Sequence, residues 1–308
     1  MVSFQPHHFR KPDAHAPGRT GILTTAPPGA RETQLIAPGG AGSINWTPLG
    51  PSAVSHGQAS GHPPVSGRIT ALAVGPGGSR IYAGTANGGT WFSGDGGMTW
   101  IPLDDYSTSP SFISHLEADS LSVGALAVSF AASAANDTIF VGTGEPQSGQ
   151  DLPLGDGYFG IGIRSSSSGG APGSWTLEGT NLAGHGTFKI IIDPDDPTLV
   201  YAATSRGLYQ RPTGGDFRTW NQVSGGFANL NGVVSDLVVA GSGSNKLYYA
   251  AFWGEQVYSS LDGANWTPLA LPSSTSFGRI ALAAGEQDDR LPCGRAYLCR
   301  HSEPGLAF

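Results

Sequence analysis

Four consecutive segments of the chain follow one pattern, and this internal repeat limits the possible folds more than any other feature. Each segment shows two strand-like runs separated by a turn, a third run, a glycine-rich hairpin and a final strand that carries a tryptophan. The segments are 67–103, 122–179, 188–223 and 232–269, with tryptophans at Trp100, Trp175, Trp220 and Trp266. A repeat of about 45 residues is typical of a four-stranded propeller blade. The sequence therefore predicts an all-β fold, a β-propeller of four-stranded blades with about four complete blades and a partial one, which leaves open an incomplete ring.

The composition fits a chain with frequent turns and excludes several kinds of partner. Glycine (47) and proline (23) are spread over the 308 residues without a collagen period. The net charge of −7 argues against nucleic acid, which requires clustered Lys and Arg. No apolar run reaches the roughly 18 residues that a spanning helix requires, so we expect no membrane insertion. Three early histidines, His7, His8 and His15, have no Cys or acidic partner at ligand spacing. We therefore expect neither a metal nor a cofactor.

The glycine-rich hairpin has a structural explanation. In "SGDGGMTW", the glycines can take positive φ at the tip, and Asp95 can accept hydrogen bonds from backbone N–H groups of its own turn. Trp100 can then pack between neighbouring sheets. The arrangement returns as "SLDGANW". We therefore predict structural rather than catalytic roles for Ser93, Asp95, Trp100, Ser260, Asp262 and Trp266.

The Ser-x-Asp-Gly…Trp hairpin resembles the Asp-box, also called the BNR repeat. The order of the segments is similar to that of bacterial sortilin-like and glycosyl-hydrolase-like Asp-box β-propellers. The matching phrases are "GRITALAVGP", "IYAGTANGGTW", "FVGTGE", "VYAATSRGLY" and "GRIALAAGE". Relatives include sialidases, xyloglucan-cleaving hydrolases, sortilin-type receptors and a photosystem II assembly factor, so the resemblance implies a fold and no single function. They are commonly exported, which suggests a secreted or cell-envelope location.

Two comparisons with these relatives weaken the case for an enzyme. Xyloglucan-cleaving relatives place a catalytic Asp where this chain has Ala86 and Asn87. Sialidases open an arginine triad with a Phe/Tyr-Arg-Ile-Pro motif, which the chain lacks. Arg68 and Arg279 stand instead at strand starts that repeat for structural reasons.

The two ends of the chain depart from the repeat. Residues 1–43 lack the apolar core of a secretory signal and are predicted to be disordered; residues 44–289 form the predicted propeller. Trp46 repeats the end of a blade and could belong to an outer strand that closes a ring. Residues 290–308 are predicted to be an atypical tail after a truncated fifth blade. That tail contains both cysteines, Cys293 and Cys299, which could form a disulfide or remain an accidental pair of thiols.

Binding or catalysis is expected on the face where the loops between the middle strands of each blade open. Glu145 ends the second strand of its segment, and the longest insertion follows it, with Asp151, Asp156, Tyr158 and Phe159. The corresponding places in the other segments hold Asn87, Arg206, Trp253 and Glu255.

The carboxylates on this face allow a catalytic interpretation and a structural one. A glycosidase requires two carboxylates, which Glu145 with Asp156 or with Glu255 could supply, and Tyr158 and Trp253 could stack on sugar rings. In the structural interpretation, Glu145 accepts hydrogen bonds from the inserted loop and holds it. The acidic stretch "DPDDP" from Asp193 is explained as turn chemistry in preference to a calcium site.

Three functions remain open on the sequence alone. The first is a non-catalytic binding module for a glycan or a protein ligand, which uses the face around Glu145 and Trp253. The second is an Asp-box glycoside hydrolase that acts on polysaccharide, with Glu145 and Asp156 as the carboxylate pair. The third is a truncated product without independent activity. In an incomplete ring, open sheet edges would also favour self-association.

Overall fold

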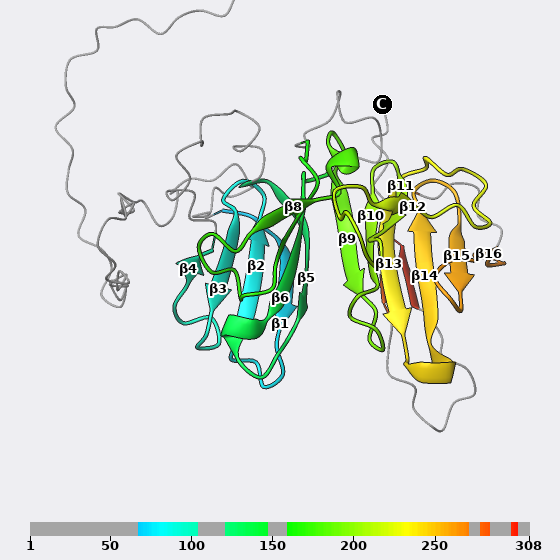
Figure 1. Ribbon diagram of the computed structural model, residues 1–308. Coiled ribbons are helices and arrows are strands. Elements are labelled where there is room, and N and C mark those ends of the chain that lie inside the picture. The colour runs from blue at the N-terminus through cyan, green and yellow to red at the C-terminus, as the bar shows by residue number, and fades with distance from the viewer. Residues whose placement is uncertain (1–66, 104–120, 147–158, 271–277, 284–296, 301–308) are drawn as a thin grey trace, which may run out of the picture. The chain divides into compact units, whose positions relative to one another are not determined.

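The computed structural model describes residues 67–103, 121–146, 159–270, 278–283 and 297–300. These residues form four antiparallel four-stranded sheets and one two-stranded sheet, and in each sheet the strands are neighbours in the order of the sequence (Figure 1). We call the four-stranded sheets blades 1 to 4. The predictions for residues 1–43, Trp46, Asp151, Asp156, Tyr158 and the cysteine side chains lie outside the described residues.

The strand bounds repeat from blade to blade. Blade 1 contains β1 (Ile69–Val74), β2 (Ile81–Thr85), β3 (Thr90–Ser93) and β4 (Ile101–Pro102). Blade 2 contains β5 (Val123–Ser129), β6 (Thr138–Thr143), β7 (Ile163–Ser166) and β8 (Thr176–Glu178). Blade 3 contains β9 (Thr187–Ile192), β10 (Val200–Thr204), β11 (Gly207–Gln210) and β12 (Asn221–Gln222). Blade 4 contains β13 (Val234–Ala240), β14 (Leu247–Phe252), β15 (Val257–Ser260) and β16 (Thr267–Pro268). The two-stranded sheet pairs β17 (Ile280–Ala283) with β18 (Tyr297–Arg300).

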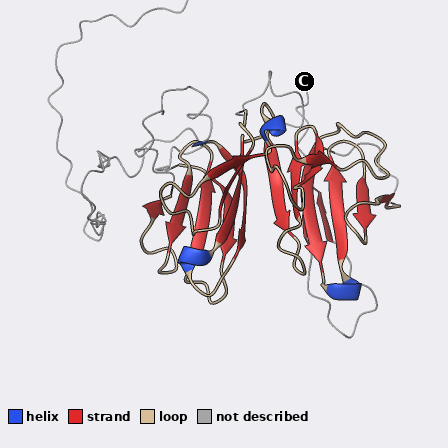
Figure 2. Cartoon of the chain, viewed as in Figure 1, coloured by secondary structure: helices blue, strands red, loops and turns tan. Residues whose placement is uncertain are grey.

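Helix is limited, in the described part of the chain, to short 3-10 turns (Figure 2). These are η3 (Ala134–Asn136), η5 (Thr180–Leu182) and η6 (Gly243–Asn245). The same part of the chain contains no helix with the length and apolar character needed to cross a bilayer.

The first strand of every blade carries a register shift near its start. In blade 1 the pairing with β2 passes from Ile69 directly to Ala71, and the same one-residue shift recurs in blades 2, 3 and 4. A bulge of this kind changes the direction in which the next side chains point. The register therefore places Leu72, Leu126 and Leu237 at equivalent positions, three residues after the strand begins.

The hydrophobic core lies between consecutive blades. The innermost strands β1, β5, β9, β13 and β17 contact one another in that order. One apolar cluster joins blades 1 and 2, another joins blades 2 and 3, a third joins blades 3 and 4, and a fourth joins blade 4 to β17. Blades 2 to 4 thus pack against a neighbour on both faces, which explains why the first two strands of each are largely apolar. The predicted architecture of four-stranded propeller blades is confirmed.

The first blade differs because nothing among the described residues precedes it. Ile69 is 52% exposed and Leu72 58% exposed, whereas their equivalents in blade 4, Val234 and Leu237, are both 0% exposed. In blades 2 to 4 these positions contact the preceding blade. The apolar side chains on this face of β1 therefore occupy the positions that are buried in the other blades, but no preceding blade covers them within the described residues.

Buried carboxylates reinforce the first two interfaces between blades. Asp137 of blade 2 accepts hydrogen bonds from Arg80 Nη1 (2.7 Å) and Tyr82 Oη (2.8 Å) of blade 1. Glu178 of blade 2 accepts two bonds from Arg211 of blade 3, at 2.7 and 2.9 Å. Charge-assisted bonds of this geometry also fix the orientation of one blade against the next.

The acidic turn of blade 3 supplies the carboxylate for the third interface. Asp193 accepts hydrogen bonds from the backbone N–H groups of Asp195 (2.8 Å) and Asp196 (3.0 Å), as expected of a turn. It also accepts bonds from Lys246 Nζ (2.9 Å) and from Tyr248 Oη in blade 4. The cation next to the Asp193 carboxylate is thus the ammonium group of Lys246. No group of three His, Cys, Asp or Glu side chains in the described segments is arranged to hold a metal ion.

The two aspartate hairpins share one hydrogen-bond pattern. Ser93 Oγ donates to Asp95 Oδ1 at 2.7 Å, and that carboxylate accepts from Thr99 N (2.9 Å) and Thr99 Oγ1 (2.6 Å). Trp100 Nε1 donates to the carbonyl oxygen of Gly97 (3.1 Å). In blade 4 the bonds recur at Ser260, Asp262, Asn265 and Trp266. Trp266 is buried between blades 3 and 4, whereas Trp100 in the first blade is half-buried.

Candidate functional site

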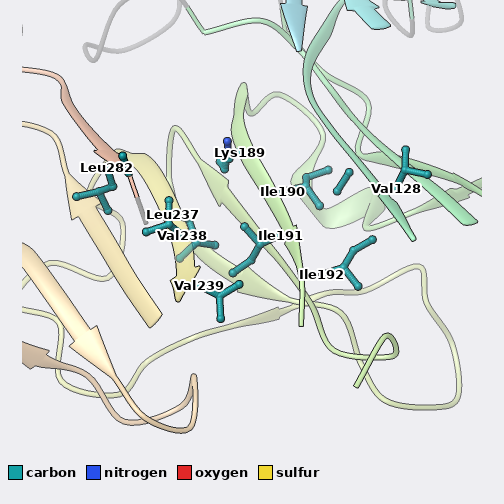
Figure 3. A pocket seen from close by; sticks show the side chains of 11 residues that line it. Val128, Lys189, Ile190, Ile191, Ile192, Leu237, Val238, Val239 and Leu282 are labelled. Carbon is teal, nitrogen blue, oxygen red and sulfur yellow. The ribbon is translucent and has the colours of Figure 1, made fainter. Parts of the chain in front are cut away.

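An apolar groove runs along the innermost strands (Figure 3). It has a volume of about 410 Å³ and is lined by Ala127, Val128, Lys189, Ile190, Ile191, Ile192, Leu237, Val238, Val239, Leu282 and Ala283. Figure 3 shows aliphatic side chains from β5, β9, β13 and β17 around this space, with Lys189 as the charged one. Lys189 is the ionisable side chain of this lining, which contains no carboxylate, so the groove does not offer the carboxylate pair that glycoside hydrolysis requires.

A second, polar pocket lies between the loops of blades 3 and 4. Its volume is about 630 Å³, and it is lined by His185, Ser205, Arg206, Tyr209, Asn229, Asn231, Gly232, Val233, Trp253 and Glu255. Arg206 comes from the β10–β11 turn, and Trp253 and Glu255 come from the β14–β15 turn. Because successive blades repeat one topology, these two turns open on the same side. The structure thus brings together three residues that the sequence marked as ligand-binding.

The backbone around the pocket is held by hydrogen bonds within and between its loops. Arg206 N donates to Thr204 Oγ1 (3.1 Å), at the end of β10. Trp253 N donates to the carbonyl oxygen of Val233 (2.8 Å), so the β14–β15 turn is tied to the connection that leads into β13. These bonds fix the positions from which the pocket side chains extend.

The carboxylate and the two carboxamides form a connected group. Asn229 Nδ2 donates to Glu255 Oε1 (3.2 Å), and Asn231 N donates to Asn229 Oδ1 (3.2 Å). Gln222 Nε2 donates to Asn231 Oδ1 (3.1 Å). Each of these side chains keeps further donor or acceptor capacity, because a carboxylate accepts about four hydrogen bonds and a carboxamide has two donors and two lone pairs.

The indole of Trp253 and the phenol ring of Tyr209 both line the pocket. Trp253 is half-buried, and its ring lies 6.2 Å from the ring of Phe188, the residue at the bulge of β9. The guanidinium of Arg279 also lies over the Phe188 ring, 5.4 Å from its centroid. The β9 bulge therefore supports Trp253 from the side of the innermost strands.

Burial and the charge of Arg206 together shift the pKa values of the groups on the blade 3 side. Burial lowers the pKa of His185, and the nearby positive charge of Arg206 lowers it further. Burial raises the pKa of the Tyr209 phenol, and Arg206 opposes that rise. His185 and Tyr209 therefore favour their uncharged forms at neutral pH, and the lining also contains the guanidinium of Arg206 and the carboxyl group of Glu255.

Glu145 lies elsewhere, in an ion pair. It is 7% exposed, and Arg68 Nη2 lies 2.5 Å from its Oε2. Burial raises the pKa of Glu145, while Arg68 and Arg279 act in the opposite direction. Glu145 does not line the polar pocket, so the structure does not bring Glu145 and Glu255 into one site.

Two further candidates from the sequence are exposed and lie outside the pocket lining. Asn87 is exposed in the turn between β2 and β3, and Phe159 is 43% exposed. The partner proposed for Glu145, Asp156, is not among the described residues, nor is Tyr158.

Sequence reasoning missed five polar side chains of the polar pocket: His185, Ser205, Tyr209, Asn229 and Asn231. His185 and the two asparagines lie in the connections from one blade to the next, outside the turns between middle strands from which the sequence predicted ligand-binding residues. A usable signal was present in "ANLNG", where two asparagines precede a strand start. Those connections open on the same face as the turns between the middle strands, so polar residues of both can contribute to one site.

Comparison with known proteins gives structural similarity without sequence relatives. No family model matches the chain, and no curated protein matches it. An ancestral GH74 enzyme has a TM-score of 0.45 and 20% identity, covering 66% of this chain and 25% of its own. YCF48 bound to D1 peptide has a TM-score of 0.42 and 15% identity, covering 76% and 62%. YCF48 from Cyanidioschyzon merolae has a TM-score of 0.40 and 18% identity, covering 70% and 62%.

The chain spans between a quarter and less than two thirds of the length of these three proteins. Its own geometry defines its architecture: four-stranded antiparallel sheets that follow one another along the chain and pack through their innermost strands. The chain has the blade architecture of a β-propeller.

Proposed function

We propose that the protein is a non-catalytic binding module, that its site is the polar pocket between blades 3 and 4, and that its ligand is a glycan. One observation carries the proposal: an indole, a carboxylate, a guanidinium and two carboxamides from separate loops converge on one pocket of about 630 Å³. This volume lies within the ordinary range for small-molecule sites, about 300–1,000 Å³.

The residue types suit a sugar. A pyranose presents hydroxyl groups, which both donate and accept hydrogen bonds, around its rim and C–H groups on its faces. Glu255 and Asn229 can exchange hydrogen bonds with hydroxyls, and the half-buried face of Trp253 provides an apolar surface for the ring. A purely apolar ligand would leave these polar groups without partners, at a cost in affinity.

The chemistry of the pocket supports binding rather than turnover. Glycoside hydrolysis by the usual route requires two carboxyl groups on either side of the scissile bond. The lining contributes one, Glu255. The other titratable side chains of the lining are His185, Tyr209 and Arg206, and none of them is a carboxyl group.

As part of the same proposal, we assign this β-propeller chain to the Asp-box group. It is supported by the paired hydrogen-bond patterns at Asp95 and Asp262, in which a serine and a downstream residue both contact the carboxylate. In both hairpins the tryptophan Nε1 donates to a glycine carbonyl within the same turn. We propose an Asp-box propeller of the sortilin-like or glycosyl-hydrolase-like kind on this basis.

A glycan screen with a matched pair of variants tests the proposed site. Trp253→Ala removes the aromatic surface and is expected to weaken binding by at least about tenfold, because buried aromatic anchors contribute strongly to affinity. Trp91→Ala is the control, since Trp91 is also a half-buried tryptophan but belongs to β3 of blade 1. Near-UV circular dichroism verifies that both variants keep the wild-type fold. Unchanged affinity in Trp253→Ala, or no binding of any glycan by the wild-type chain, would refute the proposal.

One observation favours a second function, a glycoside hydrolase that uses Glu145. Burial raises the pKa of this carboxyl, and a general acid must hold its proton near the working pH. The enzyme hypothesis expects wild-type protein to release reducing ends from polysaccharide, and Glu145→Gln to lose nearly all of that activity while keeping its fold. If the wild type releases none from the polysaccharides that it binds, the enzyme hypothesis fails and the binding module stands.

A further inference from the structure

The polar pocket is lined by two side chains of opposite charge that are not paired with each other. Arg206 lines it from blade 3 and Glu255 from blade 4, and these two side chains form no ion pair. A ligand that fills the pocket therefore meets a cationic side and an anionic side. The position of each charge constrains which chemical group the ligand can place there.

The guanidinium of Arg206 is available to a ligand. Arg206 is exposed, and within the described residues its guanidinium has no hydrogen-bond or ion-pair partner. Other pocket-facing or interface arginines of the described chain are engaged: Arg68 binds Glu145 and Arg211 binds Glu178. Arg206 lines the pocket together with His185 and Tyr209, and its positive charge acts to lower the pKa of both groups.

The blade 4 side has the opposite character. Glu255 is half-buried and is oriented by Asn229, whose Nδ2 donates to it at 3.2 Å. A negatively charged ligand group beside Glu255 would be repelled, whereas a hydroxyl could donate to the carboxylate. Trp253 comes from the same turn and offers its ring surface next to this group.

We propose that the glycan bound in this pocket is acidic, with a uronic-acid carboxylate on Arg206 and the uncharged hydroxyl edge of the sugar toward Glu255 and Asn229. This inference rests on the proposed glycan-binding function and adds the class of sugar. A guanidinium presents paired N–H donors that match the two oxygens of a carboxylate. The separation of charges predicts one carboxylate per bound unit, because a second one would face Glu255.

The test compares an acidic disaccharide with its neutral counterpart. The probes are an aldobiouronic acid, which carries one carboxylate, and its methyl ester, which keeps the shape and removes the charge. Isothermal titration calorimetry is performed with the full chain. We expect the wild type to bind the acid about tenfold more tightly than the ester, equal to about 1.4 kcal/mol. Added salt should weaken the binding of the acid and leave that of the ester unchanged.

Two arginine variants locate the effect. Arg206→Gln should lose the preference for the acid and bind both probes with the affinity that the wild type has for the ester. Arg218→Gln is the matched control, because Arg218 is an exposed arginine of the same blade that does not line the pocket. It should keep the wild-type preference. Both substitutions are at exposed positions and leave the core untouched, so folding is preserved.

The outcomes separate this inference from the proposed function. If the wild type binds acid and ester equally, in a manner that requires Trp253, the glycan-binding function stands and the acidic class is wrong. If neither probe nor any glycan in the screen binds, the proposed function itself fails. If an acidic dipeptide of similar size binds as tightly as the acidic sugar and depends on Arg206, the ligand class is a peptide and the inference is overturned.

Discussion

The equivalence of Leu72 and Leu237 provides a quantitative test of how the blades are stabilised. Both stand three residues after the start of an innermost strand, yet Leu237 is 0% exposed and Leu72 is 58% exposed. Replacing a fully buried leucine by alanine costs about 2–5 kcal/mol, because transfer and cavity terms add. For Leu72 about two fifths of the side chain is buried and no enclosed cavity forms, so the transfer term alone predicts about 1 kcal/mol.

Thermal melts followed by near-UV circular dichroism measure this difference, since the seven tryptophans report on tertiary packing. At about 2–4 °C per kcal/mol for a domain of this size, Leu237→Ala should lower Tm by about 4–20 °C and Leu72→Ala by no more than about 4 °C. Leu126→Ala, at the same position in blade 2 and 8% exposed, should resemble Leu237→Ala.

Equal losses at Leu72 and Leu237 would refute the reasoning. They would mean that the face of β1 is covered in solution, by another part of the chain or by a second copy. A concentration-dependent Tm for the wild type would identify the second copy. A melt without a cooperative transition would instead support the interpretation of the chain as a truncated product that does not fold independently.

Two further predictions concern carboxylates. Asp193→Ala should lower the free energy of unfolding by about 3–5 kcal/mol, because Lys246 and the buried Tyr248 lose their shared acceptor. Urea denaturation measures this loss. The control is Asp195→Asn, at an exposed carboxylate that also contacts Lys246, and its stability should stay near that of the wild type. The hydrogen bonds from Thr99 lower the pKa of Asp95 to about 2, and backbone bonds from Asn265 lower that of Asp262 as well. Both groups then stabilise the fold fully above their ordinary pKa of about 4. Asp95 loses that contribution as the pH falls through about 2, and Asp262 loses it at still lower pH. When both aspartates are replaced by Asn, the decrease of Tm with falling pH below about 4 should therefore be smaller than in the wild type. The same decrease in the variant as in the wild type would contradict this account.

The candidate site shows how far a single sequence can lead toward function. Arg206, Trp253 and Glu255 were identified from one rule, the place in each repeat where the middle strands are joined, and the structure brings all three into one pocket. The same rule also selected Asn87, which is exposed in blade 1 and does not line the pocket. A position in a repeat defines the face on which a residue lies. It does not define which neighbouring blades enclose a cavity.

The sequence by itself determined the fold class, because alternation, turn residues and the tryptophan period are local signals that recur in four copies. It also determined the roles of Asp95 and Asp262 in their turns, since those hydrogen bonds stay within a few residues. Only the tertiary structure decided that Glu145 pairs with Arg68 and not with Glu255, and that Asp193 meets Lys246, because these partners are between 53 and 77 residues apart. Such contacts depend on how one blade is set against the next, and the packing of side chains between blades, not the pattern along any one of them, fixes that arrangement.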